Sequence, residues 1–181
     1  SCLKGWQKII VSSDKDFFQL VDSETILYRP IQKQLLNEKD ILENHKIHPQ
    51  NMALARAIVG DKSENLPGIA GIGLTTVANR FPFLSDEESH TIDEVLKHCQ
   101  NANSTAKAYT NIIEGEDIVR QNYKMMQLYA PSISVQGKTY LRETIKNCEI
   151  TFNKTEIKKM MIQDGFGEFN WIDLYQIFNR I

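Results

Sequence analysis

The chain has 181 residues, of which 41% are hydrophobic and 24% charged, and a formal net charge of −2. This length suits one domain or one and a half small ones. The composition is that of an ordinary globular protein, which excludes a disordered tail, a collagen and a disulfide-stapled miniprotein. No stretch approaches the roughly 20 apolar residues of a membrane span. With so little net charge, any basic surface that binds nucleic acid must be a local patch. Three cysteines without CxxC spacing indicate reduced intracellular thiols.

The first part of the chain predicts a small amount of β structure. Apolar runs predict a buried strand over residues 8–12 and a second strand over 25–29, with which residues 31–36 could pair. A short helix is expected between the two strands, over 17–21. These elements indicate an α/β start.

Helical patterns dominate from Asn37 onward. Gly60 and Pro131 are natural helix stops, and the capping-box pattern Thr91-x-x-Glu94 should open a helix. A second capping-box pattern, Ser85-x-x-Glu88, precedes it. The expected helices cover residues 37–48, 50–59, 75–80, 91–96, 104–113 and 116–129.

The C-terminal part predicts further amphipathic helices. Apolar residues recur at helical spacing in two stripes, over 157–161 and 171–178. A basic stripe of Lys138, Arg142 and Lys146 suits a solvated helix face better than a phosphate site. The four histidines, His45, His48, His90 and His98, show no metal-binding spacing and are expected to be ordinary surface or core-edge residues.

Two aspartates, Asp14 and Asp16, follow the first predicted strand. In an extended backbone, residues two apart point the same way, so both carboxylates could face one point in space. Paired hard oxygen donors suit Mg²⁺ or Mn²⁺. The same residues could instead cap a helix, with Ser13 or Asp14 as the N-cap and Asp16 in the first turn. Spacing alone favours capping, and the two uses are compatible.

Four of the nine glycines lie between residues 60 and 73. The pattern Gly68-x-x-Gly71-x-Gly73 differs from the dinucleotide-binding fingerprint and lies between two predicted helices. A hairpin without side chains lets the backbone approach a phosphate closely, and Ile69 and Ile72 would anchor it. Such a hairpin grips a nucleic-acid backbone without reading bases. A plain inter-helix turn is the alternative.

Together, the two segments resemble the 5′-nuclease family, which includes phage RNase H-type and flap endonucleases and the 5′–3′ exonuclease domain of bacterial DNA polymerase I. The segment VSSDKDFFQL, residues 11–20, is similar to the acidic strand-end motif of the family. The segment VGDKSENLPGIAGIG, residues 59–73, is similar to its helix–three-turn–helix motif. The resemblance is specific over about residues 8–81, and beyond them only the helical character agrees.

The resemblance implies an α/β fold in three regions. Residues 1–36 would be a small β-containing part of a PIN-like nuclease core that carries the acidic motif. Residues 37–83 would form the helix–three-turn–helix region that binds DNA, and residues 84–181 a helical C-terminal region.

The resemblance also implies the site residues. Asp14, Asp16 and Asp61 would be catalytic and, with Glu64, would hold Mg²⁺ or Mn²⁺. Duplex backbone would bind at the hairpin, often around a monovalent cation such as K⁺. The residues of this DNA-binding set are Gly68, Gly71, Gly73, Thr75 and Thr76.

Several residues depart from the family pattern. Glu64 stands where Asp is usual, so a longer side chain must reach the same ion. Ala70 and Leu74 stand where Pro is common, and Thr75 stands where Lys is common. The upstream half of the family, with further acidic residues and the arch for a single-stranded 5′ end, is not part of the sequence. That half is expected as a covalent or separate partner.

The leading hypothesis is the C-terminal portion of a Mg²⁺-dependent, structure-specific 5′–3′ exonuclease or flap endonuclease. It would act on duplex DNA with a 5′ flap or nick in replication or repair, in the cytoplasm of a bacterial or phage-infected cell and without a membrane. One alternative is a non-catalytic duplex-DNA-binding or scaffold subunit that uses the glycine hairpin. Another is a helical protein-interaction domain that keeps the motifs as fold elements.

Overall fold

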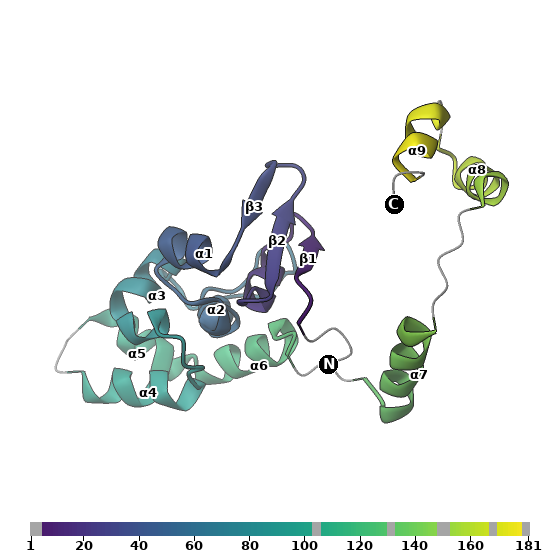
Figure 1. Ribbon diagram of the computed structural model, residues 1–181. Coiled ribbons are helices and arrows are strands. Elements are labelled where there is room, and N and C mark those ends of the chain that lie inside the picture. Colours follow the sequence, from purple (N-terminus) through teal and green to yellow (C-terminus); the bar gives the residue numbers. More distant parts are fainter. Residues whose placement is uncertain (1–4, 103–105, 130–132, 148–152, 167–169, 179–181) are drawn as a thin grey trace. The chain divides into compact units, whose positions relative to one another are not determined.

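The computed structural model describes residues 5–102, 106–129, 133–147, 153–166 and 170–178. They divide into two compact units, Leu3–Ser132 and Ile133–Ile181. Figure 1 shows their elements, which form a mixed α/β fold that is mostly helical. The predicted fold class is therefore confirmed. The predicted region boundaries after residues 36 and 83 stay a prediction, and the compact units divide elsewhere.

A small sheet opens the first unit. Its strands are β1 (Lys8–Val11), β2 (Thr25–Arg29) and β3 (Gln34–Leu36), in that spatial order. β1 and β2 are parallel, and the 3-10 helix η1 (Lys15–Leu20) connects them; β2 and β3 are antiparallel. Both predicted strands and the predicted pairing of the segment 31–36 are thus present.

The prediction that the first strand is buried is wrong. Ile9 and Val11 are 57% and 66% exposed, and Leu35 on β3 is 58% exposed, whereas Leu27 on β2 is fully buried. Alternate residues of a strand point to opposite faces, and an apolar run cannot tell which face is covered. Only one face of this sheet packs against the core of the first unit.

Helix α1 (Glu38–His45) begins at a capping box formed by Asn37 and Asp40, and it ends at Lys46 in a left-handed conformation. A 3-10 turn, η2 (Pro49–Asn51), leads into α2 (Met52–Val59), and Gly60 ends α2 as predicted. The predicted helix over 50–59 is therefore confirmed, except that its first residues form the tighter turn. Proline at the start of that turn fits this geometry, since its missing N–H is not needed there.

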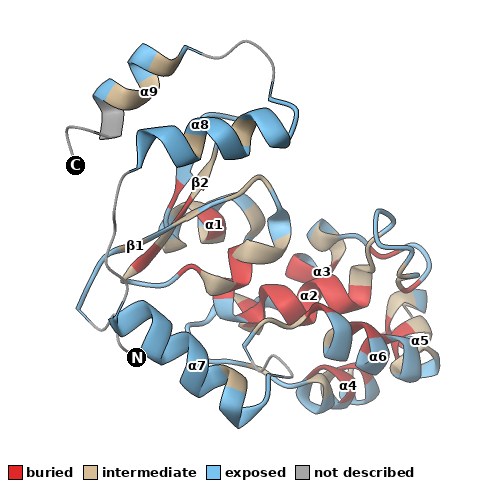
Figure 2. Ribbon diagram, turned by 90° about the vertical axis from the view of Figure 1, so that its right-hand side faces the viewer, coloured by how far each residue is buried: buried red, intermediate tan, exposed pale blue. Residues whose placement is uncertain are grey.

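The core of the first unit surrounds α2. All residues from Met52 to Ile58 are buried, and α2 packs most extensively against α6 (Glu116–Met126) and also against α3 (Leu74–Arg80). Figure 2 shows α2 in the colour of buried residues along almost its whole length. A helix buried on all sides lies in the middle of a core, and every charged group on it must be paired.

The segment between α2 and α3 closes on itself through two glycines. A Cβ on Gly68 would overlap the carbonyl of Val59, and one on Gly60 would overlap the backbone of Gly68. The two glycines therefore allow the chain to pass directly against the end of α2. Within the same segment Ile69 and Ile72 are buried, which confirms their predicted role as anchors.

Three more helical segments follow α3: η3 (Pro82–Ser85), α4 (Ile92–Asn101) and α5 (Lys107–Glu114). Thr91 and Glu94 form the predicted capping box of α4. The pattern at Ser85 opens no helix, because Ser85 ends η3 and its hydroxyl donates a hydrogen bond to the Pro82 carbonyl. Helix α6 ends at Met126, three residues before the predicted end, since Gln127 is extended.

The second unit consists, in its described residues, of three helices. They are α7 (Val135–Lys146), α8 (Lys154–Gln163) and α9 (Trp171–Phe178). No residue of α7 or α8 is buried, and the basic stripe predicted at Lys138, Arg142 and Lys146 lies exposed on α7. The solvated-face interpretation of this stripe is consistent with that exposure.

Replacing Gly68 by Ala should lower the free energy of unfolding by more than about 2 kcal/mol, because the new methyl group meets backbone that cannot move alone. Gly73 has an ordinary φ of −112° and open space around it. The matched Gly73→Ala change should therefore stay within about 0.5 kcal/mol. Urea unfolding of both variants measures the difference, and equal losses would contradict the close approach at Gly68.

Candidate active site

The acidic residues come from two segments of the first unit. Asp14 is the N-cap of η1: its Oδ1 accepts a hydrogen bond from the Asp16 N–H at 2.9 Å, and Asp16 lies in the first turn. The capping interpretation of this pair is therefore confirmed. Asp61 follows Gly60 at the end of α2, where it forms a two-way backbone bridge with Leu66.

Arg56 joins these two segments. Its Nη2 lies 2.6 Å from Asp16 Oδ1 and 2.5 Å from Asp61 Oδ2. Arg56 is 8% exposed and projects from the buried helix α2. The structure thus brings two of the predicted site residues, Asp16 and Asp61, to the same guanidinium nitrogen of Arg56.

The two carboxylates differ in their protonation energetics. Burial raises the pKa of Asp16, the positive charge of Arg56 lowers it, and the negative charges of Asp14, Asp61 and Glu64 raise it again. In contrast, the Ser63 hydroxyl, which donates a hydrogen bond of 2.6 Å to Asp61 Oδ1, lowers the pKa of Asp61. The pKa of Asp61 is thus set mainly by hydrogen bonding, and that of Asp16 by burial.

The donor atoms at Asp16 and Asp61 fit a hard divalent cation. Asp16 Oδ1 is buried and accepts no hydrogen bond of good geometry in the described part of the chain, although the Arg56 charge lies next to it. Mg²⁺ commonly uses only one or two protein carboxylates and keeps several waters. Among the described residues, no group of three or more His, Cys, Asp or Glu side chains is arranged to hold a metal ion. The four-residue metal set therefore stays a prediction.

The glycine hairpin presents two of its three glycines to solvent. Gly71 has a φ of +77° and Gly73 is the N-cap of α3; a Cβ at either position would meet nothing within 4 Å. Gly71, Gly73 and Thr75 are exposed, whereas Gly68 packs against Val59. Open backbone at Gly71 and Gly73 is what a close approach to a phosphate needs. The structure gives Gly68 a packing role, and its predicted contact with DNA stays a prediction.

Three buried polar residues that the sequence analysis did not select hold these segments in place. Arg56 forms ion pairs with the carboxylates of Asp16 and Asp61. Asn122 on α6 donates hydrogen bonds to the carbonyls of Ala57 and Pro67, and so joins α6 to α2 and the hairpin. Gln19 donates from Nε2 to the carbonyls of Asp16 and Met126. A lone arginine in an Ala-rich apolar helix was a usable signal, since buried arginines are rarely unpaired. No sequence pattern indicated the structural roles of Asn122 and Gln19.

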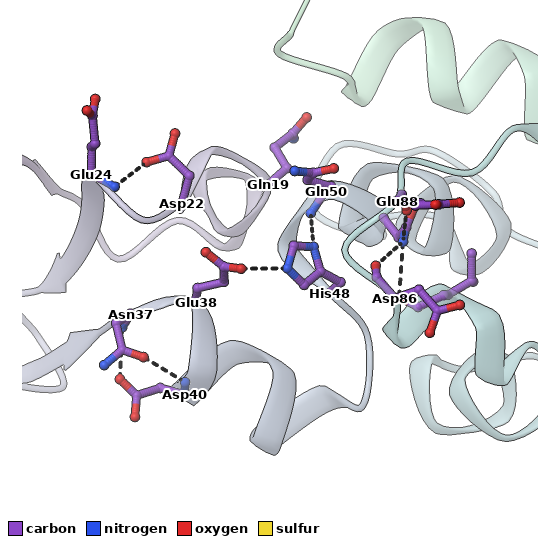
Figure 3. A network of polar contacts seen from close by, with 12 residues as sticks. Gln19, Asp22, Glu24, Asn37, Glu38, Asp40, His48, Gln50, Asp86 and Glu88 are labelled. Carbon is purple, nitrogen blue, oxygen red and sulfur yellow. Dashed lines mark hydrogen bonds and ion pairs between the residues drawn. The ribbon is translucent and has the colours of Figure 1, made fainter. Parts of the chain in front are cut away.

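Three of the four histidines make contacts with groups other than Asp16 and Asp61. His48 is buried and its Nε2 is 2.7 Å from Glu38 Oε1, and its Nδ1 accepts a hydrogen bond from the Gln50 N–H, as Figure 3 shows. His90 lies 3.5 Å from Glu94. The His98 ring contacts those of Phe81 and Phe83. These contacts give structural roles to three of the four histidines.

No helix in the described ranges is both long enough and apolar enough to cross a bilayer.

No family model matches the chain, but several curated proteins are similar to it. The 5′-3′ exonuclease of Aquifex aeolicus is 34% identical over 161 residues, covering 87% of this chain and 52% of that protein. The 5′-3′ exonuclease of Buchnera aphidicola is 36% identical over 167 residues, covering 92% of this chain and 55% of that protein. The chain thus spans about half the length of these curated relatives.

Solved structures share the fold. A crystal structure of a bacteriophage T5 flap endonuclease, in a pseudo-enzyme-product complex with DNA and metal ions, is similar with a TM-score of 0.54 at 18% identity. The match covers 65% of this chain and 42% of that chain. The likeness confirms the expected architecture for the matched part.

Replacing Ser63 by Ala should raise the pKa of Asp61 toward its ordinary value of about 3.9. In the folded wild-type protein the pKa of Asp61 is lower than this ordinary value. Ionised Asp61 therefore stabilises the fold at every pH above the ordinary pKa. This stability disappears as the pH falls through the folded pKa. The variant should therefore melt below the wild type at neutral pH, with a gap that closes in acid.

Melting temperatures from neutral pH down to about pH 3, with a ¹³C NMR titration of the Asp61 carboxyl, measure this effect. Ser85→Ala is the control, because the Ser85 hydroxyl donates its hydrogen bond to a backbone carbonyl and not to a carboxylate. A pH-independent gap for Ser63→Ala would show that the hydroxyl acts on packing alone.

Proposed function

Because this chain belongs to the 5′-nuclease family, we propose that it forms the DNA-gripping and carboxylate-bearing part of a metal-dependent 5′–3′ exonuclease or flap endonuclease. The observation that carries this proposal is the convergence of Asp16 and Asp61 on one cationic position beside the glycine hairpin. The whole enzyme would cleave DNA during replication or repair, in the cytoplasm of a bacterial or phage-infected cell.

Asp16 and Asp61 would hold Mg²⁺ or Mn²⁺ directly, with Asp14 and Glu64 adding negative charge nearby. A bound divalent cation supplies a water of lowered pKa and neutralises charge that develops on a phosphodiester. The chain itself contributes the fixed carboxylates: η1 positions Asp16, and the Asp61–Leu66 bridge positions Asp61. Fixed positions matter because orientation accounts for a large part of enzymatic rate enhancement.

Duplex DNA would lie with its backbone against Gly71, Gly73, Thr75 and Thr76. The support is the open space at both glycines and the burial of Ile69 and Ile72 behind them. A hairpin held by its own core presents backbone N–H groups with little loss of conformational entropy when a phosphate binds. A monovalent cation such as K⁺ would sit between this hairpin and the phosphate.

The uncovered side of the sheet supports an upstream half as partner. Val11 pairs in register with Tyr28, and Tyr28 with Leu35, so the exposed Val11 and Leu35 share one face. β1 is also an edge strand among the described residues. Parallel sheets are ordinarily covered on both faces. A covalent or separate upstream half, covering this face and supplying further acidic residues, would complete the nuclease.

A non-catalytic duplex-DNA-binding subunit is the second candidate. The observation that favours it is that Arg56 already occupies the position between Asp16 and Asp61. In that case the role of the two carboxylates would be to form ion pairs with Arg56, and the glycine hairpin alone would bind DNA.

The chain should bind duplex DNA without sequence preference and with an affinity that falls as salt rises, because each neutralised phosphate releases counterions. Gly73→Val should weaken binding at least about tenfold, since its side chain fills the space through which the phosphate approaches. Gln100→Val introduces the same side chain at an exposed position of α4 and should not change binding. Fluorescence anisotropy across a salt titration measures both, and equal binding by the two variants would exclude the hairpin as the DNA contact.

In Mg²⁺ the chain alone should cleave a 5′-flap substrate very slowly or not at all, and adding the upstream half should restore cleavage. Asp16→Ala in the restored enzyme should lower the rate roughly a hundredfold or more, since even outer partners of metal ligands contribute about 10–100-fold. DNA binding should stay largely intact. The control is Asp86→Ala, which removes an exposed carboxylate that does not belong to the proposed metal set.

Robust metal-dependent cleavage by the chain alone would show that its own carboxylates suffice. Undiminished cleavage by the Asp16→Ala enzyme would remove the metal-ligand role of Asp16. Absence of cleavage even with the upstream half would favour the non-catalytic candidate.

A further inference from the structure

Arg56 is the only charged residue of α2, in a helix that is otherwise apolar and almost wholly buried. Placing a guanidinium in such surroundings costs free energy unless it is paired. Both of its partners are residues that the proposed function assigns to a divalent cation. Arg56 and the proposed divalent cation would therefore contact the same two carboxylates.

The way in which Arg56 pairs differs from a dedicated structural ion pair. A guanidinium and a carboxylate usually form two parallel hydrogen bonds, which use two nitrogens. Here the single atom Nη2 serves both Asp16 and Asp61, while Nε is buried without a hydrogen-bond partner among the described residues. Nη2 thus lies between two carboxylate oxygens, where a small cation could also lie. The planar guanidinium does not form its usual pair of parallel hydrogen bonds with either carboxylate.

The surrounding charge exceeds what Arg56 can neutralise. Besides Asp16 and Asp61, which Arg56 contacts directly, the carboxylates of Asp14 and Glu64 lie close enough to interact electrostatically with Asp16. A divalent cation would offset this negative charge better than a single positive charge does.

We propose that Arg56 is a positioning residue that stands in for the divalent cation. It holds Asp16 and Asp61 at ion-pair distance before a cation binds, and it gives up the position of Nη2 when the cation arrives. This inference rests on the proposed function, because it assumes that Asp16 and Asp61 are metal ligands. If Arg56 were a purely structural partner, it would keep both contacts in either case.

The test compares Mn²⁺ binding by the wild-type chain, Arg56→Met and Arg29→Met. Isothermal titration calorimetry gives the dissociation constant, and melting curves with EDTA or with Mn²⁺ give the stabilisation by metal. Arg56→Met should melt below the wild type in EDTA, because two carboxylates lose their counter-ion. Its melting temperature should rise more with Mn²⁺ than that of the wild type, and it should bind Mn²⁺ roughly tenfold more tightly or better.

Arg29→Met is the matched control for net charge. Arg29 lies next to the acidic turn, donates a hydrogen bond to the Ser13 carbonyl and stacks on Phe18, but contacts neither carboxylate. It loses the same charge and should bind Mn²⁺ nearly as the wild type does. Equal tightening in both variants would overturn the proposal, since net charge alone would then explain the gain.

The remaining outcomes separate this inference from the proposed function. Wild type and Arg56→Met binding Mn²⁺ equally would overturn the role of Arg56 and leave the metal site intact. No Mn²⁺ binding by any of the three chains would overturn both. Binding by Arg56→Met with none by the wild type would support both.

If Arg56→Met does not fold, NMR of the wild-type chain decides the question. The Nε–H signal of Arg56, identified by its loss in Arg56→Lys, should shift when Mg²⁺ is added to a sample labelled with both ¹³C and ¹⁵N. The Asp61 carboxyl signal reports occupancy of the site in the same sample. An unchanged Arg56 signal alongside a shifted Asp61 signal would overturn the proposal, as would the absence of both shifts.

Discussion

The buried charge of Arg56 is the constraint on which the site depends. Helix α2 supplies the centre of the core, so a guanidinium on it must find negative partners at the surface of that core. It finds one in the turn after β1 and one directly after α2. The sheet and the helical part of the first unit are thereby joined by an electrostatic contact between Arg56 and the two carboxylates of the proposed metal site. Stability and the proposed function are coupled here, because removing Arg56 leaves two partly buried carboxylates without their counter-ion.

Packing around α6 turns that contact into a defined geometry. Asn122 fixes the end of α2 and the start of the hairpin through two carbonyls, and Gln19 fixes the acidic turn against the end of α6. Each of these amides is 1–2% exposed, so its hydrogen bonds are made away from water. Buried amides that lose their partners are costly, which makes the arrangement specific rather than merely compact. One helix thus aligns both segments that carry the proposed chemistry.

The sequence was most informative where local rules decide the structure. The strand over residues 25–29, the capping box at Thr91, the stop at Gly60 and the anchors Ile69 and Ile72 follow from patterns within a few residues. It failed where a second segment decides, since the exposed face of β1 depends on what covers the sheet. The ion pair of Asp16 with Arg56 joins distant parts of the chain, and no periodicity reveals it.

The hairpin and Asp61 belong to one short segment, and this determines how DNA and carboxylates could be aligned. Gly68 passes against the end of α2, and the Asp61–Leu66 bridge closes the loop between them. Any phosphate held at Gly71 or Gly73 is therefore placed relative to Asp61 by covalent geometry and a few backbone hydrogen bonds. It does not depend on the packing of one domain on another. Alignment of this kind needs no rearrangement on binding, which is the condition under which positioning contributes most to a rate. The opposite holds for the exposed face of the sheet. Residues that an upstream half would place opposite Asp16 would have to be aligned by an interface between the two halves. The accuracy of that interface would then limit the rate of the completed enzyme.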